Sequence, residues 1–258
     1  MTPGKWQQME TAPRPVAHAR WVRASHWIVT LSVAALAFTG LEILMVHPRL
    51  YWGEVGNDLT PALLELPISR NHQHGGWTAP AAFFEGDTSP VSSSRTFEIF
   101  NQNGWGRSLH FLAGWALVVT GLFYLVIGVL GGHVGRHLVP PTAQRTLAHA
   151  RSEIFDHLRL RIAPAAGGPD YGLLQRLAYL AVVFVMLPLT AVTGLTMSPA
   201  LTAAFPILLT TFGGQQSART LHFAAFLGLM LFVGVHVAMV VLSGFRRQLR
   251  AMTIGGTP

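Results

Sequence analysis

Four long apolar stretches, separated by polar segments, dominate the hydrophobic pattern of the chain. They cover about residues 27–46, 109–131, 175–197 and 219–245. A bilayer core about 30 Å thick needs roughly 20 apolar residues in helical form, because lipid cannot pair the hydrogen-bonding groups of the backbone. Each stretch has that length. The pattern therefore predicts an all-α membrane protein, a bundle of four transmembrane helices.

Three features interrupt this pattern. Pro188 lies inside the third stretch and predicts a kink there. A shorter apolar run, Leu201–Phe212, is broken by Pro206 and is too short to span, so we expect an interfacial or re-entrant segment. The long polar loop 47–106 is rich in Pro, Gly, Ser and aromatic residues. A loop of this length usually has a function, and its aromatic residues favour an ordered docking surface.

Arginine is unevenly distributed among the polar segments, and this predicts the orientation of the chain. Most of the 18 Lys and Arg residues lie in residues 1–25, in 131–176 and after residue 245. Loops with an excess of basic residues face the cytoplasm. Both termini are therefore expected to be cytoplasmic and loop 47–106 periplasmic. Residues 1–25 have no apolar core, so a cleaved signal peptide is not expected.

The composition excludes several classes of protein. The chain is 50% hydrophobic and only 11% charged, with a mean hydropathy of +0.40, which is not the composition of a soluble globule. Its net charge of +7 is spread between apolar blocks, so nucleic-acid binding is not expected. With no Cys, the chain has no disulfide, no Cys-ligated iron–sulfur cluster and no c-type haem attachment. The 12 His residues remain as candidate metal ligands.

Four histidines lie in the predicted spans or at their ends. His222 and His236 are 14 residues apart on the fourth span, which places them on one helix face within about 40° and separates them by roughly 21 Å. The predicted orientation puts His110 at the depth of His222 on the outer side, and His26 at the depth of His236 on the inner side. Two facing imidazoles from different helices are the ligands that a b-type haem uses.

An arginine precedes three of these positions by one helical turn. The repeated motif is Arg-x-x-His-aromatic, with Arg23, Arg107 and Arg219 as its basic residues. Arginine binds carboxylates through paired hydrogen bonds, so these side chains are candidates for the propionates of a haem. The alternative is an interfacial anchor at the start of a helix.

The tripeptide Thr-Gly-Leu also occurs three times, at residues 39–41, 120–122 and 193–195. By helical phase, Gly40 and Gly121 face the same side as the histidine of their own span, at the depth of the other haem. Glycine at these positions, and at Gly114 one turn after His110, would let a flat macrocycle approach the backbone. Close packing of small residues between membrane helices explains them equally well.

Other polar residues near the spans are weaker candidates. His133 and His137 follow the second span and could compete with His26 for an inner iron, although their Gly-rich and Arg-flanked setting is typical of a loop. Glu42 could relay a proton for a quinone, but a carboxylate pointing into the membrane interface is the favoured interpretation.

These histidines and their motifs resemble the cytochrome b561-type di-haem membrane subunits of formate dehydrogenases, nickel–iron hydrogenases and thiosulfate reductases. The segments HPRLYWGE at 47–54 and FNQNGWGRSLH at 100–110 are similar to the thiosulfate reductase cytochrome b subunit group. The resemblance covers nearly the whole chain. It implies a single cytochrome b domain, 1–258, with two haem b groups that carry electrons between a periplasmic catalytic subunit, often a molybdopterin oxidoreductase, and membrane quinone.

Carried onto this chain, the resemblance makes His110 and His222 the outer haem ligands and His26 and His236 the inner ones. It implies a multi-pass protein of the bacterial inner membrane that acts as the electron-transfer subunit of an oxidoreductase complex. The alternative is a stand-alone quinol oxidase that passes electrons to a small oxidant such as superoxide. The long outer loop favours a protein partner.

Overall fold

A computed structural model describes residues 18–57, 60–68, 103–142, 145–159 and 172–255. Within them, four helical segments are long and apolar enough to cross a membrane: Arg20–Val46, Trp105–Leu130, Leu173–Thr196 and Gln215–Leu242. The predicted all-α, four-helix membrane class is confirmed.

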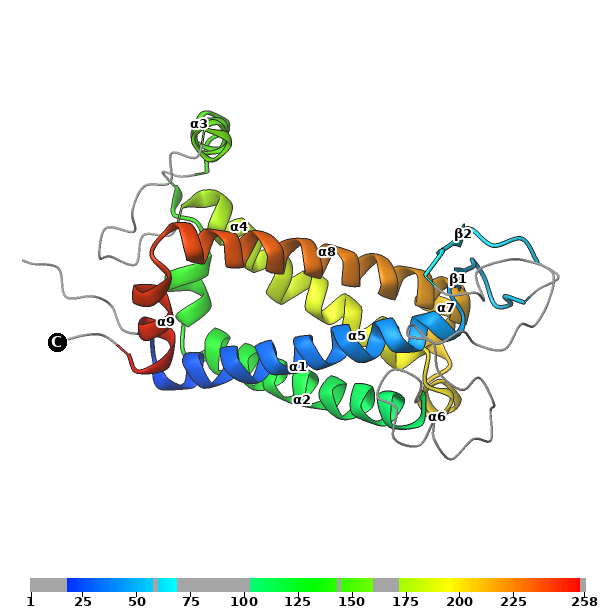
Figure 1. The fold of residues 1–258 in the computed structure, drawn as a ribbon. Helices are drawn as coiled ribbons and strands as arrows, with labels where there is room; N and C mark the ends of the chain where they lie inside the picture. The colour runs from blue at the N-terminus through cyan, green and yellow to red at the C-terminus, as the bar shows by residue number, and fades with distance from the viewer. Residues whose placement is uncertain (1–17, 58–59, 69–102, 143–144, 160–171, 256–258) are drawn as a thin grey trace, which may run out of the picture. The chain divides into compact units, whose positions relative to one another are not determined.

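The elements follow one another along the chain as labelled in Figure 1. They are α1 Arg20–Val46, β1 Arg49–Leu50, β2 Leu64–Glu65, α2 Asn103–Leu130, η4 Val134–Leu138, α3 Leu147–Leu158, α4 Leu173–Ala181, η6 Val182–Met186, α5 Leu187–Thr196, α6 Pro199–Ala204, α7 Ile207–Phe212, α8 Gln215–Leu242 and α9 Phe245–Thr253.

The helix ends differ from the ends of the apolar stretches. Helix α2 begins at Asn103 and α8 at Gln215, several residues before the predicted spans. Backbone hydrogen bonding continues beyond the apolar stretches, so polar residues extend both helices. The fourth span was predicted to reach about residue 245, whereas α8 ends at Leu242, and Gly244, with a φ of +107°, separates it from α9. A glycine accepts this left-handed conformation without strain.

The third span departs from α geometry just before Pro188. It consists of α4, the π-helical turn η6 and α5, with the proline in the first turn of α5. Proline has no N–H and its ring clashes with the carbonyl four residues earlier, and a π turn accommodates both effects. The apolar run 201–212 forms the end of α6 and the six-residue helix α7, with Phe205 and Pro206 between them. As predicted, it is too short to span.

The chain divides into two compact units, each described by itself. Unit 1 contains the described parts of Met1–Trp27, Phe123–Val182 and Leu231–Pro258. In it, the indole N–H of Trp27 donates to the carbonyl of Met252 at 3.0 Å, which fixes α9 to the start of α1. The buried Arg176 of α4 donates to the carbonyl of His137 at 2.7 Å and so holds η4.

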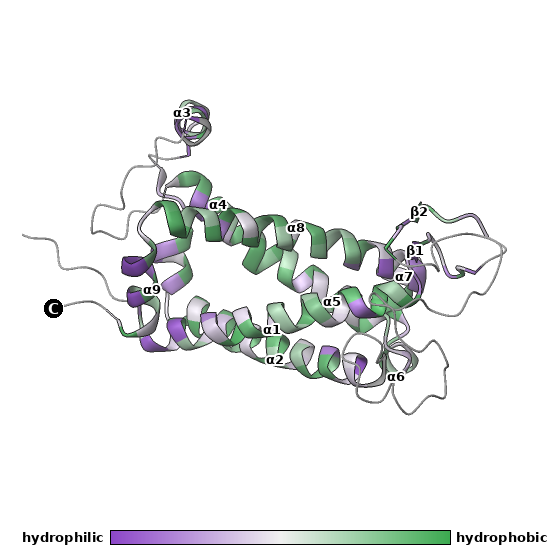
Figure 2. Cartoon of the chain, viewed as in Figure 1, coloured by the Kyte–Doolittle hydropathy of each residue, from purple (hydrophilic) through white to green (hydrophobic). Residues whose placement is uncertain are grey.

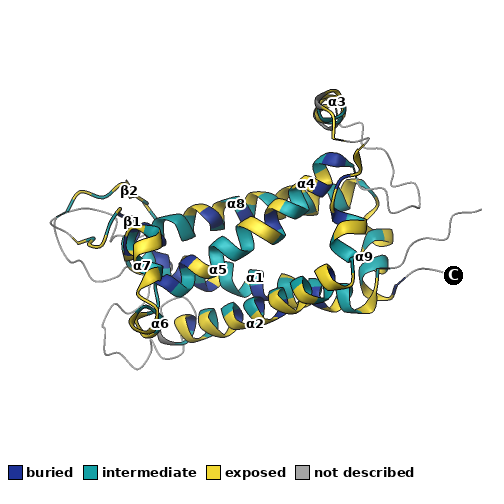
Figure 3. Cartoon of the chain, turned by 180° about the vertical axis from the view of Figure 1, so that it is seen from behind, coloured by how far each residue is buried: buried dark blue, intermediate teal, exposed yellow. Residues whose placement is uncertain are grey.

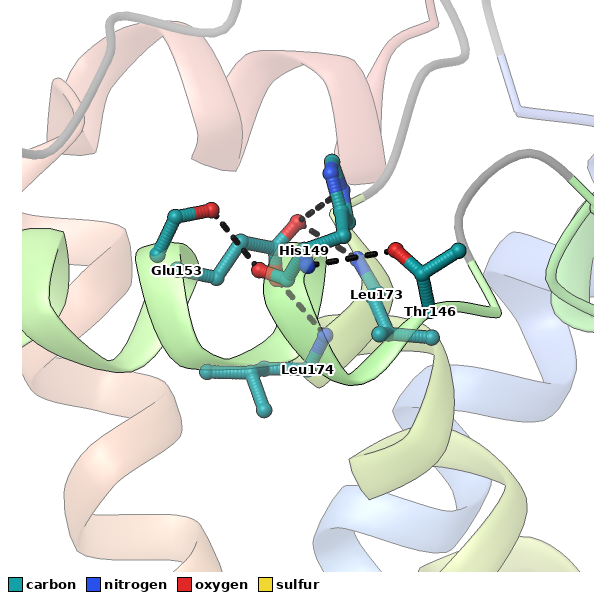
Figure 4. A network of polar contacts seen from close by, with 6 residues as sticks. Thr146, His149, Glu153, Leu173 and Leu174 are labelled. Atoms are coloured by element: carbon teal, nitrogen blue, oxygen red, sulfur yellow. Dashed lines mark hydrogen bonds and ion pairs between the residues drawn. The ribbon is translucent and has the colours of Figure 1, made fainter.

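Unit 1 also contains a side-chain cap between two helices (Figure 4). Both carboxylate oxygens of Glu153 on α3 accept hydrogen bonds from the first backbone N–H groups of α4, those of Leu173 and Leu174, each at 2.8 Å. His149, one turn earlier on α3, lies 3.2 Å from the same carboxylate. The first N–H groups of a helix have no partner within it, so Glu153 satisfies two of them.

Unit 2 contains the described parts of Ile28–Leu122 and Val183–Met230. Its short strands β1 and β2 pair antiparallel. The carbonyl of Gly53 accepts from the backbone N–H groups of Gln216 and Ser217, and the N–H of Gly53 donates to the Ser217 hydroxyl at 2.7 Å. Thr220 donates to the carbonyl of Tyr51 at 2.6 Å. The segment after β1 is thereby fixed to the first turns of α8.

The surfaces of the long helices are apolar. Hydrophobic residues are frequent along α2 and α8 in Figure 2, and Figure 3 shows exposed positions along the same two helices. Leu112, Leu130 and Leu231 are 67%, 82% and 71% exposed. Large apolar side chains on this scale would be costly in water and are stable against lipid tails.

Candidate functional site

Unit 2 brings together the two histidines that were predicted to form the outer pair. His110 of α2 and His222 of α8 have ring centroids 6.3 Å apart, with their planes at 58°. The first turn of α8 carries the contacts to loop residues described above, and His222 follows Thr220 by two residues. The described first part of the loop is therefore anchored next to this pair, and most of the predicted docking surface, residues 69–102, lies outside the described residues.

Unit 1 brings together the predicted inner pair. His26 of α1 and His236 of α8 have ring centroids 6.4 Å apart, with their planes at 52°. Aromatic rings surround them. Phe232, one turn before His236, stacks on it at 5.6 Å, and Tyr179 of α4 meets it edge-on at 6.4 Å. Trp27 lies edge-on to His26 at 5.3 Å.

The two spacings can be compared with those of a metal held between two imidazoles. A metal–imidazole bond is about 2.0 Å long. The centre of a five-membered ring with bonds near 1.3 Å lies about 1.1 Å from each ring atom. Two imidazoles on opposite sides of one metal then have centroids about 6 Å apart. The observed 6.3 Å and 6.4 Å fit this arrangement in both pairs.

The number of ligands also fits haem iron. Among the described residues, no group of three or more His, Cys, Asp or Glu side chains is arranged to hold a metal ion. A zinc site needs three or four protein ligands. Haem iron needs only axial ligands from the protein, because the macrocycle supplies the remaining four.

Two residues of the first Thr-Gly-Leu tripeptide form a seat for the ring of His110. The Oγ1 atom of Thr39 lies 2.9 Å from Nδ1 of His110. A Cβ added at Gly40 would lie 3.4 Å from Cε1 of the same ring. Thr39 is fully buried. Gly40 was predicted to admit a macrocycle or to allow close packing of helices, and in the structure its lack of a side chain makes room for an imidazole.

The third Thr-Gly-Leu tripeptide forms an equivalent seat for His222. Oγ1 of Thr193 lies 3.1 Å from Nδ1 of His222, and a Cβ at Gly194 would lie 3.3 Å from its Cε1. The carbonyl of Thr190 lies 2.9 Å from the same Nδ1. Sequence reasoning missed Thr39, Thr193 and Gly194 as site residues. The repeat itself was the available signal, because each seat uses a threonine and the glycine that follows it.

The other two predicted glycines have open space beside them. A Cβ added at Gly114 or Gly121 would meet no atom of the described residues within 4 Å. Both positions belong to α2. Their predicted contact with a macrocycle stays a prediction.

The three arginines of the Arg-x-x-His motif have different surroundings. Arg219 donates to the carbonyls of His47 and, at 3.1 Å, Arg49, so it holds the segment that follows α1. Arg23 donates to the carbonyl of Thr253 at the end of α9, at 3.1 Å. Arg107 is exposed. Binding of propionates by these side chains stays a prediction.

The structure also describes the surroundings of two weaker candidates, Glu42 and His133. Glu42 is only 6% exposed, and its carboxylate lies so close to α2 that a Cβ at Gly106 would clash with Oε2. The expectation that Glu42 points into the membrane interface is therefore wrong. His133 packs against Trp21, with ring centroids 5.2 Å apart, and against His137 at 4.6 Å.

Comparison with known proteins places the chain in a family. The sequence profile described as "Prokaryotic cytochrome b561" matches residues 17–255. A curated protein of Azospira oryzae, named "Putative protein-methionine-sulfoxide reductase subunit YedZ1", is 28% identical over 225 residues, which cover 87% of this chain and 90% of that protein. No solved structure matches.

The match extends over nearly all of the chain, including the four long helices and both histidine pairs. The histidine spacing agrees with what this family implies about its cofactor. The chain belongs to the prokaryotic cytochrome b561 family, and is a multi-pass membrane protein that binds haem b and transfers electrons.

Proposed function

We propose that the chain is a di-haem subunit, one cytochrome b domain over residues 1–258, that moves electrons between a periplasmic oxidoreductase and membrane quinone. His110 and His222 would hold the outer haem, and His26 and His236 the inner one. The two histidine pairs, with centroid distances that differ by only 0.1 Å, are the observation that carries this proposal. A bound haem supplies the one-electron couple of its iron.

The residues of the chain would prepare these sites in different ways. In unit 2, the hydroxyl of Thr39 contacts Nδ1 of His110, and the hydroxyl of Thr193 contacts Nδ1 of His222. In unit 1, the stacked ring of Phe232 limits rotation of His236 and excludes water from it. The apolar outer faces of the helices place both pairs in a low-dielectric surrounding.

The proposed partner is an oxidoreductase subunit of the molybdopterin class, on the periplasmic face of the bacterial inner membrane. The relative YedZ1 is named as a reductase subunit, which supports a catalytic partner for this chain too. The segment after β1, fixed to α8 next to His222, exposes Trp52 and Val55, each 61% exposed. We propose that the partner docks there, with both termini of the chain on the opposite, cytoplasmic side.

Haem content and single-histidine variants test the proposal. The purified chain is expected to contain two b-type haems in a pyridine haemochrome assay. His222→Ala should lose the outer haem, and the matched change on the same helix, His236→Ala, should lose the inner one. His133→Ala serves as the control and should keep both. A chain that binds a single haem, or a His133→Ala variant that loses one, would contradict the assignment.

Copurification tests the partner. Detergent extracts from the native membrane should yield a periplasmic oxidoreductase subunit together with the chain, identified by mass spectrometry. Replacing Trp52 with Ala should reduce the amount recovered while the haem content stays at two. Full recovery of the partner with this variant would place the docking surface elsewhere.

A further inference from the structure

We propose that Thr39 and Thr193 are positioning residues that fix the proton of His110 and His222 on Nδ1, present Nε2 to iron and lower the reduction potential of the outer haem. This inference rests on the proposed function, because it concerns the haem assigned to that pair. It adds a role for two threonines whose hydroxyl groups contact the imidazoles of the candidate ligands.

The other hydrogen bond of the Thr39 hydroxyl determines which group donates in its hydrogen bond with His110. A threonine hydroxyl has one hydrogen to donate. Oγ1 of Thr39 lies 2.7 Å from the backbone carbonyl of Ala35, and a carbonyl can only accept, so the hydroxyl hydrogen is used there. Toward His110, 2.9 Å away, Oγ1 must therefore accept. The hydrogen in that bond belongs to Nδ1 of His110.

The same reasoning applies to Thr193, with a second acceptor in support. Oγ1 of Thr193 donates to the carbonyl of Leu189 at 2.6 Å, so it accepts from His222 at 3.1 Å. Nδ1 of His222 also lies 2.9 Å from the carbonyl of Thr190. Because neither partner has a hydrogen to give, Nδ1 of His222 is the donor to both.

A neutral imidazole with hydrogen on Nδ1 has its lone pair on Nε2. A bond from Nδ1–H to an oxygen fixes this tautomer, orients the ring and makes the ligating nitrogen more basic. A more basic ligand stabilises ferric iron over ferrous iron. The two threonines should therefore lower the potential of the outer haem relative to a site without them.

The glycines beside the threonines make the contact geometrically specific. A Cβ added at Gly40 would lie 3.4 Å from Cε1 of His110, and one added at Gly194 would lie 3.3 Å from Cε1 of His222. Each imidazole therefore lies against the backbone of the helix that carries the glycine. The hydroxyl meets Nδ1 in the same turn. Rotation of either ring about its axis would break the hydrogen bond, so the seat fixes orientation as well as protonation.

Valine and serine variants separate the hydroxyl from the shape of the side chain. Thr39→Val and Thr193→Val keep the branched shape and remove the acceptor, while Thr39→Ser and Thr193→Ser keep the hydroxyl. The third threonine of the repeat, Thr120, is buried at 8% exposure and makes no hydrogen bond to a histidine among the described residues. Thr120→Val is therefore the matched control.

Redox titration of the intact two-haem protein gives the first readout. Each of the two valine variants at the seats should raise the potential of the outer haem and leave that of the inner haem unchanged. The serine variants should restore the original value, and Thr120→Val should change neither potential. An unchanged outer potential in both seat valine variants that still bind two haems would overturn the inference.

Pulsed electron paramagnetic resonance of the ferric protein gives an independent readout, because the coupling of the remote imidazole nitrogen depends on its hydrogen bond. The valine variants should change this coupling for the outer haem only. Loss of the outer haem in a valine variant supports the inference if serine restores it, and overturns it if serine does not. Failure of the unaltered chain to bind haem at the outer pair would instead contradict the proposed function.

Discussion

At the scale of single residues, the glycines of the two seats limit what each position tolerates. Alanine at Gly194 would put its Cβ 3.3 Å from Cε1 of His222, a ring already held by Thr193 and by the carbonyl of Thr190. The ring cannot retreat without lengthening those bonds. Overpacking of this kind costs about 1–3 kcal/mol.

We therefore predict that Gly194→Ala lowers the haem content from two toward one, with the loss at the outer site. Gly40→Ala should act in the same direction but more weakly, because its Cβ would lie 3.4 Å from His110. Gly135→Ala, at an exposed position with open space among the described residues, is the control. Optical spectra and the pyridine haemochrome assay measure the result, and equal haem content in all three variants would contradict it.

The approach of the histidines could be predicted from the sequence, whereas their seats could not. Helical periodicity and the distribution of arginine are properties of the linear chain. They suffice to place His222 and His236 on one helix face and to predict which histidine of another helix lies at the same depth as each. The contact of Thr39 with His110 joins residues 71 positions apart. It depends on how α1 and α2 pack, which no local pattern encodes.

At the scale of the elements, side chains from other segments satisfy the ends of helices. Gly172 at the N-cap of α4 makes no side-chain cap bond, and Glu153 of α3 takes that role. Similarly, Gly53, in the segment after β1, caps α8. The sequence predicted the spans but not these caps, because the partners come from segments 20 and more than 160 residues away.

We predict that Glu153→Gln lowers the free energy of unfolding by about 1 kcal/mol, the usual contribution of a helix N-cap. The amide keeps one oxygen acceptor for two N–H groups and loses the negative charge that favours a helix N-terminus. Asp156→Asn, an exposed position on the same helix, removes the same charge without a cap and is the control. Equilibrium unfolding by SDS in mixed micelles measures both, and equal effects would contradict the capping role.

At the scale of the whole molecule, the described basic residues lie away from the middles of the four long helices. In unit 1, His18 precedes α1, and Arg23 and His137 add positive charge around it. His133, Arg136 and His137 lie together after α2. The sequence predicted this excess of cations from the positions of arginine, but not that two histidines outside the spans would be partly buried among them.

This cluster makes the stability of the protein depend on pH. Burial, with the charges of His137 and Arg23, lowers the pKa of His18 from its ordinary value of 6.5, and burial likewise lowers the pKa of His133. The unfolded chain then binds protons more readily than the folded one, so the free energy of unfolding falls as pH drops below about 6.5 and stops falling once the folded histidines are protonated.

We predict that the double variant His18→Gln, His133→Gln loses less stability than the unaltered chain between about pH 8 and about pH 5.5. At the higher pH the histidines are neutral in both states, so any difference there reports packing alone and serves as the control. Unfolding by SDS at each pH gives the two slopes, and parallel slopes would mean that His18 and His133 are protonated equally in the folded and unfolded chain.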